Sequence, residues 1–125
     1  MSDIDPTAPS PPRVIVVGPC ASGKTTLVTA LRAHGYDASV SAQEHSAIPR
    51  LWQRTDPDVL IALAVNIDAV RQRRDATWPR WLHDVQEERL ANAQDAADLV
   101  IDTSNLGADE VAARALQFLE LRAST

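Results

Sequence analysis

A short apolar run, Arg13–Val17, is followed by a glycine-rich stretch and then by a helical pattern. This succession constrains the fold more than any other feature of the chain. The run is continuous and β-branched, which is typical of a strand buried on both faces of a parallel sheet. Residues 24–34 carry apolar side chains at helical spacing, and Gly35 follows as a stop signal. The sequence therefore predicts a strand, a tight turn and a helix.

The rest of the chain continues this alternation. The further predicted elements are a strand at residues 37–42, a short helix at 46–54, a strand at 59–65, helices at 67–74 and 79–97, a strand at 99–101 and a helix at 108–122. In the 79–97 helix the spacing places Leu82, Val85, Arg89 and Ala93 on one face. Strands that alternate with helices imply parallel strands joined by right-handed crossovers. We therefore predict an α/β fold, a three-layer αβα sandwich with a short parallel sheet of four to five strands.

Length and composition favour a single domain. The chain has 125 residues and 45% hydrophobic residues, which suffices for one core. Residues 1–12 hold four of the eight prolines and are predicted to be a flexible tail, and residues 13–125 to be the domain. A single cysteine excludes an internal disulfide. No apolar run is long enough to span a bilayer as a helix. We expect a cytoplasmic protein with no membrane partner.

The charge balance narrows the class of ligand. A net charge of −5 argues against a protein that coats nucleic acid through bulk charge. It leaves room for a small anion site. Of the 12 basic residues, 11 are arginine, and the one lysine is Lys24. The position of this lysine is therefore informative.

Lys24 belongs to a motif with a defined chemistry. Residues 18–25 read GPCASGKT and match the pattern G-x-x-x-x-G-K-[ST] between a strand and a helix. Such a loop aims backbone N–H groups and a helix N-terminus at a phosphate, while the lysine reaches the β- and γ-phosphates. The threonine offers its hydroxyl to Mg²⁺. The residues predicted to bind nucleotide here are Gly18, Pro19, Cys20, Ala21, Ser22, Gly23, Lys24, Thr25 and Thr26.

With this loop, the chain resembles the P-loop nucleoside and nucleotide kinase-like superfamily, which includes gluconate, shikimate and adenylylsulfate kinases. Residues 58–63 resemble the strand before the lid of these kinases, and residues 71–74 resemble their lid arginines. Residues 97–106 resemble their last strand and base-side loop. The resemblance implies the P-loop nucleoside triphosphate hydrolase fold and Mg²⁺-dependent transfer of phosphate from ATP, or another nucleoside triphosphate, to a small acceptor.

Several residues outside the loop are candidates for the same site. Glu44 follows the second predicted strand and lies beside the loop if that strand neighbours the first. There it could bind Mg²⁺ together with Thr25 or act as a base, and the alternative is a solvated carboxylate. The arginines Arg71, Arg73 and Arg74 could neutralise phosphate charge, and the alternative is a solvated helix face. We predict Lys24, Glu44, Arg71 and Arg74 as catalytic, with Arg71 also binding nucleotide.

The base-side loop and the tryptophans indicate a nucleotide site less clearly than the 18–25 loop does. The resemblance implies that Ser104 and Asn105 contact the nucleotide base, and the alternative is ordinary turn chemistry. Trp78 and Trp81 could stack on a base, but aromatic residues more often belong to the core. Cys20 is either a redox-sensitive thiol or a small residue tolerated in the loop.

The activity itself has two interpretations. The stretch that would hold an acceptor-binding subdomain is very short in this chain. The second hypothesis is therefore a minimal nucleotide-binding module or slow NTPase that has no acceptor. The acceptor, the preference between ATP and GTP, and the choice between monomer and homodimer stay open.

Overall fold

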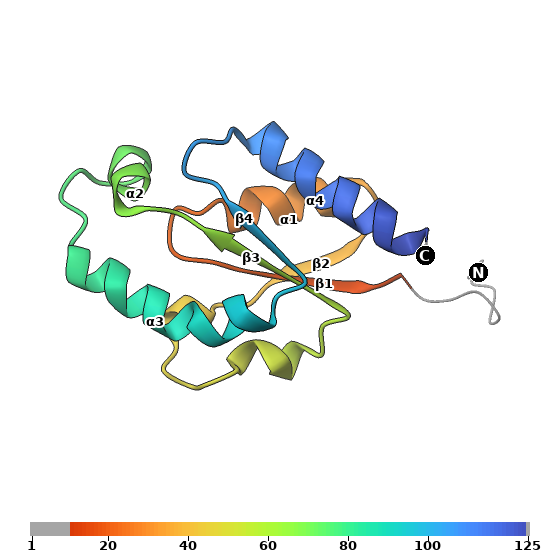
Figure 1. Ribbon diagram of the computed structural model, residues 1–125, viewed down its shortest axis with the longest axis horizontal. Coiled ribbons are helices and arrows are strands. Elements are labelled where there is room, and N and C mark those ends of the chain that lie inside the picture. Colours follow the sequence, from red (N-terminus) through yellow and green to blue (C-terminus); the bar gives the residue numbers. More distant parts are fainter. Residues whose placement is uncertain (1–10, 125) are drawn as a thin grey trace.

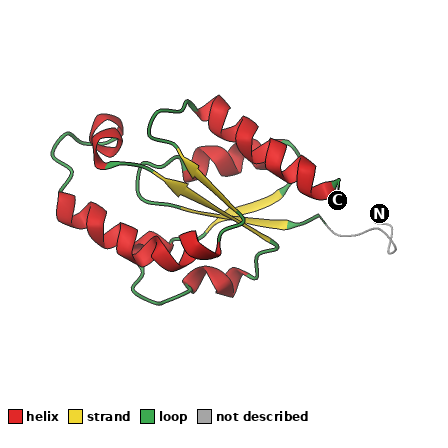
Figure 2. Ribbon diagram, in the orientation of Figure 1, coloured by secondary structure: helices red, strands yellow, loops and turns green. Residues whose placement is uncertain are grey.

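The computed structural model describes residues 11–124, so the predicted tail at residues 1–12 lies outside the described residues except for Pro11 and Pro12. Four strands form one parallel sheet in the order β2-β1-β3-β4 (Figure 2). The strands are β1 (Arg13–Val17), β2 (Asp37–Val40), β3 (Val59–Ala64) and β4 (Leu99–Asp102). The prediction of an α/β fold with a short parallel sheet is therefore confirmed, at the lower of the two strand numbers.

The two central strands, β1 and β3, are apolar on both faces because both faces are covered. Val14 and Val16 belong to one core, and Ile15 and Val17 belong to the other. The edge strands β2 and β4 are shorter and less buried, with Val40 and Val100 exposed. The continuous apolar run in β1 thus has the physical basis expected of a central parallel strand.

Helices pack on both faces of the sheet (Figure 1). On one face, α1 (Lys24–Ala33) and α4 (Ala108–Ala123) supply Leu27, Leu31, Ala115 and Leu119 to the core. On the other face, α3 (Arg80–Ala96) supplies Leu90 and Ala93. The short helix α2 (Ile67–Arg73) follows β3. This layering is compatible with a three-layer sandwich.

The buried face of α3 differs from the predicted one. Ala93 is buried as expected, but Leu82, Val85 and Arg89 are only half-buried. The fully buried positions in the first half of the helix are His83 and Gln86. The apolar pattern was misleading because Gln86 is bonded to the loop after β1, and His83 pairs with Glu87 at 2.9 Å.

The predicted helix at residues 46–54 is wrong. Two short 3₁₀ segments, η1 (Gln43–His45) and η2 (Leu51–Thr55), connect β2 to β3 instead. Pro49 offers no N–H for a helix, and Arg50 adopts a left-handed backbone with φ of 56°. The buried Gln43 side chain donates to the Ile48 carbonyl and accepts from the Trp52 amide, so it replaces helical bonds across the bend.

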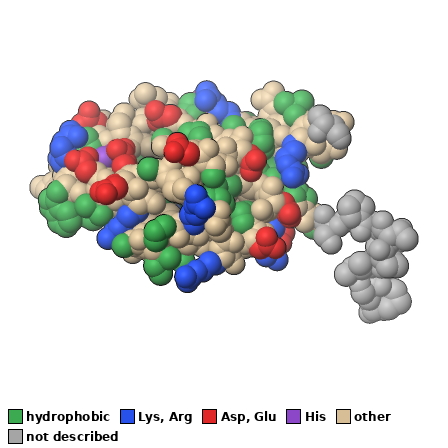
Figure 3. All heavy atoms as spheres, turned by 60° about the horizontal axis from the view of Figure 1, so that its bottom comes forward, with side chains coloured by type: hydrophobic (Ala, Val, Ile, Leu, Met, Phe, Trp, Pro, Cys, Tyr) green, Lys and Arg blue, Asp and Glu red, His purple; other side chains and the backbone are tan. Residues whose placement is uncertain are grey.

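The surface shown in Figure 3 has acidic and basic side chains interspersed, with no large region of a single sign. Among residues 11–124, no helix combines the length and the apolar character that crossing a bilayer would require.

Candidate functional site at the carboxyl edge of the sheet

The carboxyl ends of all four strands meet at one edge of the sheet because the strands are parallel. The 18–25 loop leaves β1 at this edge, and η1 follows β2 there. In the sheet, β2 lies on one side of β1 and β3 lies on the other side, so the strand order reverses at β1. Open α/β sheets bind ligands where the strand order reverses in this way.

The geometry of the 18–25 loop requires glycine at two positions for different reasons. A Cβ on Gly18 would lie 2.5 Å from Ser22 Oγ and 3.0 Å from the carbonyl oxygen of Leu63. Gly23 has a φ of +97° with open space around it, so its backbone conformation, not crowding, selects glycine. Ala21 also has a positive φ, of 64°. The loop is therefore tightly turned and packed against β3.

The loop ends at the N-terminus of α1, and no side chain caps this end of the helix. Gly23 is the N-cap residue, and no side chain places a negative charge in the first turn. The first backbone N–H groups of a helix lack acceptors within the helix, and they carry partial positive charge. In α1 these groups belong to Lys24, Thr25 and Thr26. The end of α1 is thus suited to an anion.

The Lys24 ammonium folds back over this loop. Its Nζ donates to the Gly18 carbonyl at 2.8 Å and to the Pro19 carbonyl at 3.0 Å. It also pairs with Glu44 Oε2 at 2.6 Å. All three donors of the ammonium are therefore engaged by the protein itself.

Glu44 is buried, with 3% of its surface exposed, and its second oxygen, Oε1, has no hydrogen-bond partner. It lies on η1, directly after β2, and β2 pairs with β1 in the sheet. Glu44 therefore lies beside the loop, as the sequence predicts. A buried carboxylate oxygen without a donor is costly, so this atom has unused capacity to accept a proton, a hydrogen bond or a cation.

A cavity of about 620 Å³ opens beside Lys24 and Glu44, and we call it the η1 cavity. Its volume falls in the range of small-molecule sites. Its lining residues are Cys20, Ala21, Gly23, Lys24, Thr25, Thr26, Val40, Glu44, His45, Arg74, Trp78, Leu82 and Gln86. The guanidinium of Arg74 lies 5.6 Å from the ring centre of Trp78, so these two side chains form one wall.

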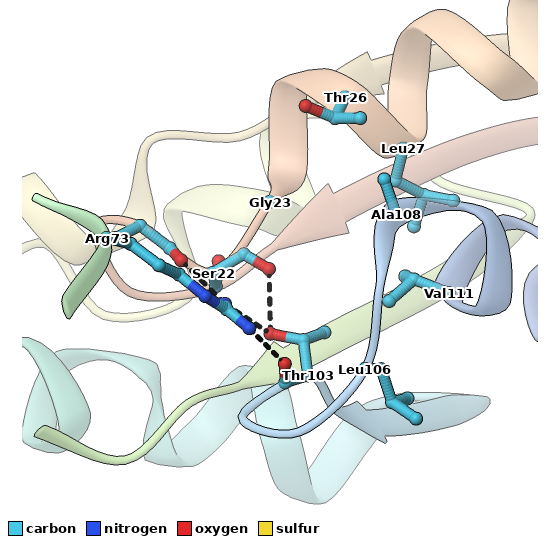
Figure 4. Close-up of a pocket in the computed structure, with 10 residues that line it drawn as sticks. Ser22, Gly23, Thr26, Leu27, Arg73, Thr103, Leu106, Ala108 and Val111 are labelled. Atoms are coloured by element: carbon cyan, nitrogen blue, oxygen red, sulfur yellow. Dashed lines mark hydrogen bonds between the residues drawn. The ribbon is translucent and has the colours of Figure 1, made fainter. Parts of the chain in front are cut away.

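A second cavity of about 250 Å³, the α4 cavity, lies on the other side of the loop (Figure 4). The Thr103 hydroxyl donates to the Ser22 carbonyl at 2.9 Å. Arg73 Nη1 donates to the Ala21 carbonyl at 3.0 Å and to Thr103 Oγ1 at 3.2 Å. These bonds tie the loop to α2 and to the end of β4. Leu27, Leu106 and Val111 form the apolar wall.

The three arginines at the C-terminal end of α2 contact different parts of the protein. Arg73 contacts the loop, Arg74 lines the η1 cavity, and Arg71 donates through Nε to the Trp78 carbonyl at 3.1 Å. Sequence reasoning offered all three arginines as candidates and chose Arg71 and Arg74 as catalytic, whereas the arginine bonded to the loop is Arg73. It also missed Thr103, whose signal was a polar residue directly after an apolar strand.

The base-side residues form a turn. Ser104 Oγ donates to Asp102 Oδ1 at 2.6 Å and accepts from the Asn66 amide at 2.9 Å. The hydroxyl and the backbone amide of Ser104 together hold the pKa of the exposed Asp102 carboxyl below its usual value. Asn105 is exposed beside it. Ser104 therefore has a structural role, and neither residue lines the α4 cavity.

The two tryptophans of this region differ from each other. Trp78 is half-buried and packs on a small core of Val65, Ala69 and Val70. Trp81 is 67% exposed, so the expectation that it belongs to the core is wrong. It points away because the inward positions of α3 are taken by His83 and Gln86.

Comparison with known proteins found no matching family model and no matching curated protein. The interpretation of this site therefore rests on its own geometry and chemistry.

Proposed function

We propose that this chain is a P-loop protein that binds a nucleoside triphosphate with Mg²⁺ and transfers its terminal phosphoryl group to a small acceptor. One observation carries the proposal. The motif loop ends at an uncapped helix N-terminus whose lysine is paired with a buried, half-satisfied glutamate at the wall of the η1 cavity.

In this proposal the phosphates occupy the η1 cavity in front of α1. The first amides of the helix would donate to phosphate oxygens, and the helix N-terminus would favour their charge. Lys24 would exchange its bonds to the Gly18 and Pro19 carbonyls for bonds to the phosphates. Arg74, on the facing wall, would add a second cation.

The residues present fit a magnesium ion. Thr25 and Glu44 both line the η1 cavity, and they offer hydroxyl and carboxylate oxygens, the donors that Mg²⁺ takes. The unpartnered Glu44 Oε1 shows that acceptor capacity is available. When bound, the ion would neutralise charge on the phosphates.

As the alternative to holding the ion, Glu44 is the group that would activate an acceptor. Its Oε2 is held by Lys24, which fixes the carboxylate, and its Oε1 would take the proton from an acceptor hydroxyl. Burial excludes water from this oxygen. Proton removal by a positioned carboxylate typically contributes about 10²- to 10⁴-fold to the rate.

The α4 cavity would receive the nucleoside. It shares Ala21, Gly23 and Thr26 with the η1 cavity, so a nucleotide could extend from one into the other around the loop. Its wall combines apolar side chains with the Arg73 guanidinium, which suits a planar base.

A second candidate function is nucleotide binding without an acceptor. The observation that favours it is the connection from β2 to β3, which forms only η1 and η2 and no separate acceptor subdomain. In this case the protein would be a nucleotide-dependent module or a slow NTPase.

ADP release from Mg·ATP, followed over a panel of nucleosides, nucleotides and sugar acids, separates the two. An acceptor that stimulates turnover, and whose effect is lost in Glu44→Gln, supports the phosphotransferase. Equal slow release across the panel supports the module. Absence of any nucleotide binding by the wild-type chain contradicts both.

A further inference from the structure

Three potential metal ligands converge in the η1 cavity: Cys20, Glu44 and His45. One ligand atom from each side chain lies within 4.8 Å of the other two. Among residues 11–124, this is the one such group of histidine, cysteine and acidic side chains. The proposed phosphotransferase uses Glu44 but gives no role to the thiol or the imidazole.

Two of the three ligand pairs have a spacing close to that around a tetrahedral metal. Cys20 Sγ lies 3.9 Å from His45 Nε2, and His45 Nε2 lies 3.7 Å from Glu44 Oε2. Zinc with its usual bond lengths separates sulfur and nitrogen ligands by about 3.6 Å, and nitrogen and oxygen ligands by about 3.4 Å. Shifts of a few tenths of an ångström would bring these two pairs to zinc spacing, and the ligand atoms of the third pair, Cys20 and Glu44, lie within 4.8 Å of each other. The His45 side chain, which is 61% exposed, has room to make these shifts.

The two buried ligands are held in place by neighbours. The Gln86 side chain accepts from the Cys20 amide at 2.9 Å and donates from Nε2 to Cys20 Sγ at 3.3 Å. A donor aimed at sulfur stabilises a thiolate ligand and orients it. Arg89 donates to the Glu44 carbonyl at 3.3 Å, while the side-chain Oε1 of Glu44 has no partner.

The donor set selects the kind of cation. Sulfur and imidazole favour zinc-class ions over Mg²⁺ and Ca²⁺, which prefer oxygen alone. We propose that Cys20, His45 and Glu44 form a three-ligand site for a zinc-class divalent cation. Three protein ligands leave one tetrahedral position open to water or another ligand. On binding, the thiol proton passes to solvent.

The site also has a consequence for the loop, and this consequence rests on the proposed function. A zinc-class ion would hold Glu44, the residue that pairs with Lys24 and would serve Mg²⁺. Both cations therefore compete for one carboxylate. We expect zinc to weaken the binding of Mg·ATP.

Titration of the full, nucleotide-free chain with Co²⁺ tests the site directly. Cobalt replaces zinc with the same ligands and reports them by absorbance. The wild-type chain is expected to give a thiolate-to-cobalt charge-transfer band, together with the intense visible bands of a tetrahedral ion. Added Zn²⁺ should abolish both. A titration with no charge-transfer band overturns the proposal.

Matched variants assign the ligands. Cys20→Ser should abolish the charge-transfer band, and His45→Gln should weaken Co²⁺ binding about tenfold or more. The control is His34→Gln, since His34 is also exposed but lies at the far end of α1. A band that survives Cys20→Ser, or equal weakening by His34→Gln and His45→Gln, contradicts the site. Circular dichroism of each variant verifies folding.

The two proposals fail separately. Cobalt binding is measured without nucleotide. Nucleotide binding is measured by calorimetry in a buffer from which a chelator has removed transition metals and to which Mg²⁺ has been added. If both occur, Zn²⁺ should lower the affinity of the wild-type chain for Mg·ATP and leave that of Cys20→Ser less affected. Equal inhibition of both proteins contradicts competition at this site.

Discussion

The η1 cavity and the α4 cavity share the 18–25 loop as a common wall but differ in how their polar groups are paired. On the α4 side, Thr103 and Arg73 complete the hydrogen bonds of the loop carbonyls. On the η1 side, Lys24 is bonded to carbonyls of its own loop, and Glu44 keeps an oxygen without a partner. One side therefore holds the loop in place, and the other retains groups that a ligand can engage.

This difference separates structural residues from binding residues within a single loop. An unpaired buried atom gains a full interaction from a ligand, whereas a bonded side chain must first give up its partners within the protein.

The largest expected effect is on the η1 side. Lys24→Met should lower the free energy of unfolding by about 3 kcal/mol, because it leaves the buried Glu44 carboxylate without its counter-charge. Urea denaturation at neutral pH measures it. The double variant Lys24→Met with Glu44→Gln should recover most of the loss, since no charge is then buried. A single variant as stable as the wild type would mean that the pair is solvated.

The next effect separates the two glycines of the loop. Gly18→Ala should cost about 2 kcal/mol, since its Cβ would meet Ser22 and the β3 backbone. Gly23→Ala should cost about 1 kcal/mol, which reflects its positive φ alone. Thermal denaturation of both variants gives the order. A larger loss of stability in Gly23→Ala than in Gly18→Ala would contradict the idea that packing on β3 fixes the conformation of the loop.

A smaller effect is expected on the α4 side. Thr103→Val keeps the shape but removes the hydroxyl that donates to Ser22, and should cost about 1.5 kcal/mol. Thr103→Ser keeps the donor and is the matched control. Chemical denaturation of the two variants should therefore differ. Equal stability would show that the hydroxyl does not tie the loop to β4.

The smallest effect concerns pH at the end of β4. Hydrogen bonds from Ser104 lower the pKa of Asp102 below its ordinary value of 3.8 in the folded state. The resulting stability is therefore present above that value and is lost as pH falls through the lower, folded pKa. Ser104→Ala should raise the pKa of Asp102 partway back, because the backbone amide still donates. NMR titration of the carboxyl carbon measures this, and an unchanged pKa would contradict it.

Much of the fold could be predicted because its signals are local. The runs at β1 and β3 are continuous and apolar, and the helical spacing of α1 and α4 matches the cores they form. The region from Ser46 to Arg54 could not be predicted. Its conformation depends on the Gln43 side chain, which bonds across the bend to residues five and nine positions away.

The site could be predicted only in part for a similar reason. Glu44 was accessible to sequence reasoning because neighbouring parallel strands end at one edge. The contacts of Arg73 and Thr103 were not, since both depend on how α2 and β4 approach the loop in space. The role of Gln86 was hidden because a polar residue on a helix is ordinarily assigned to the solvent face.

Calorimetric titration of the wild-type chain and of Lys24→Ala with Mg·ATP and Mg·GTP tests the central claim most directly. The account predicts one-to-one binding of at least one nucleotide to the wild-type chain, weakened at least tenfold in the folded variant, which corresponds to about 1.4 kcal/mol. No binding by the wild-type chain, or equal binding by both proteins, would contradict the assignment of the 18–25 loop as a phosphate site.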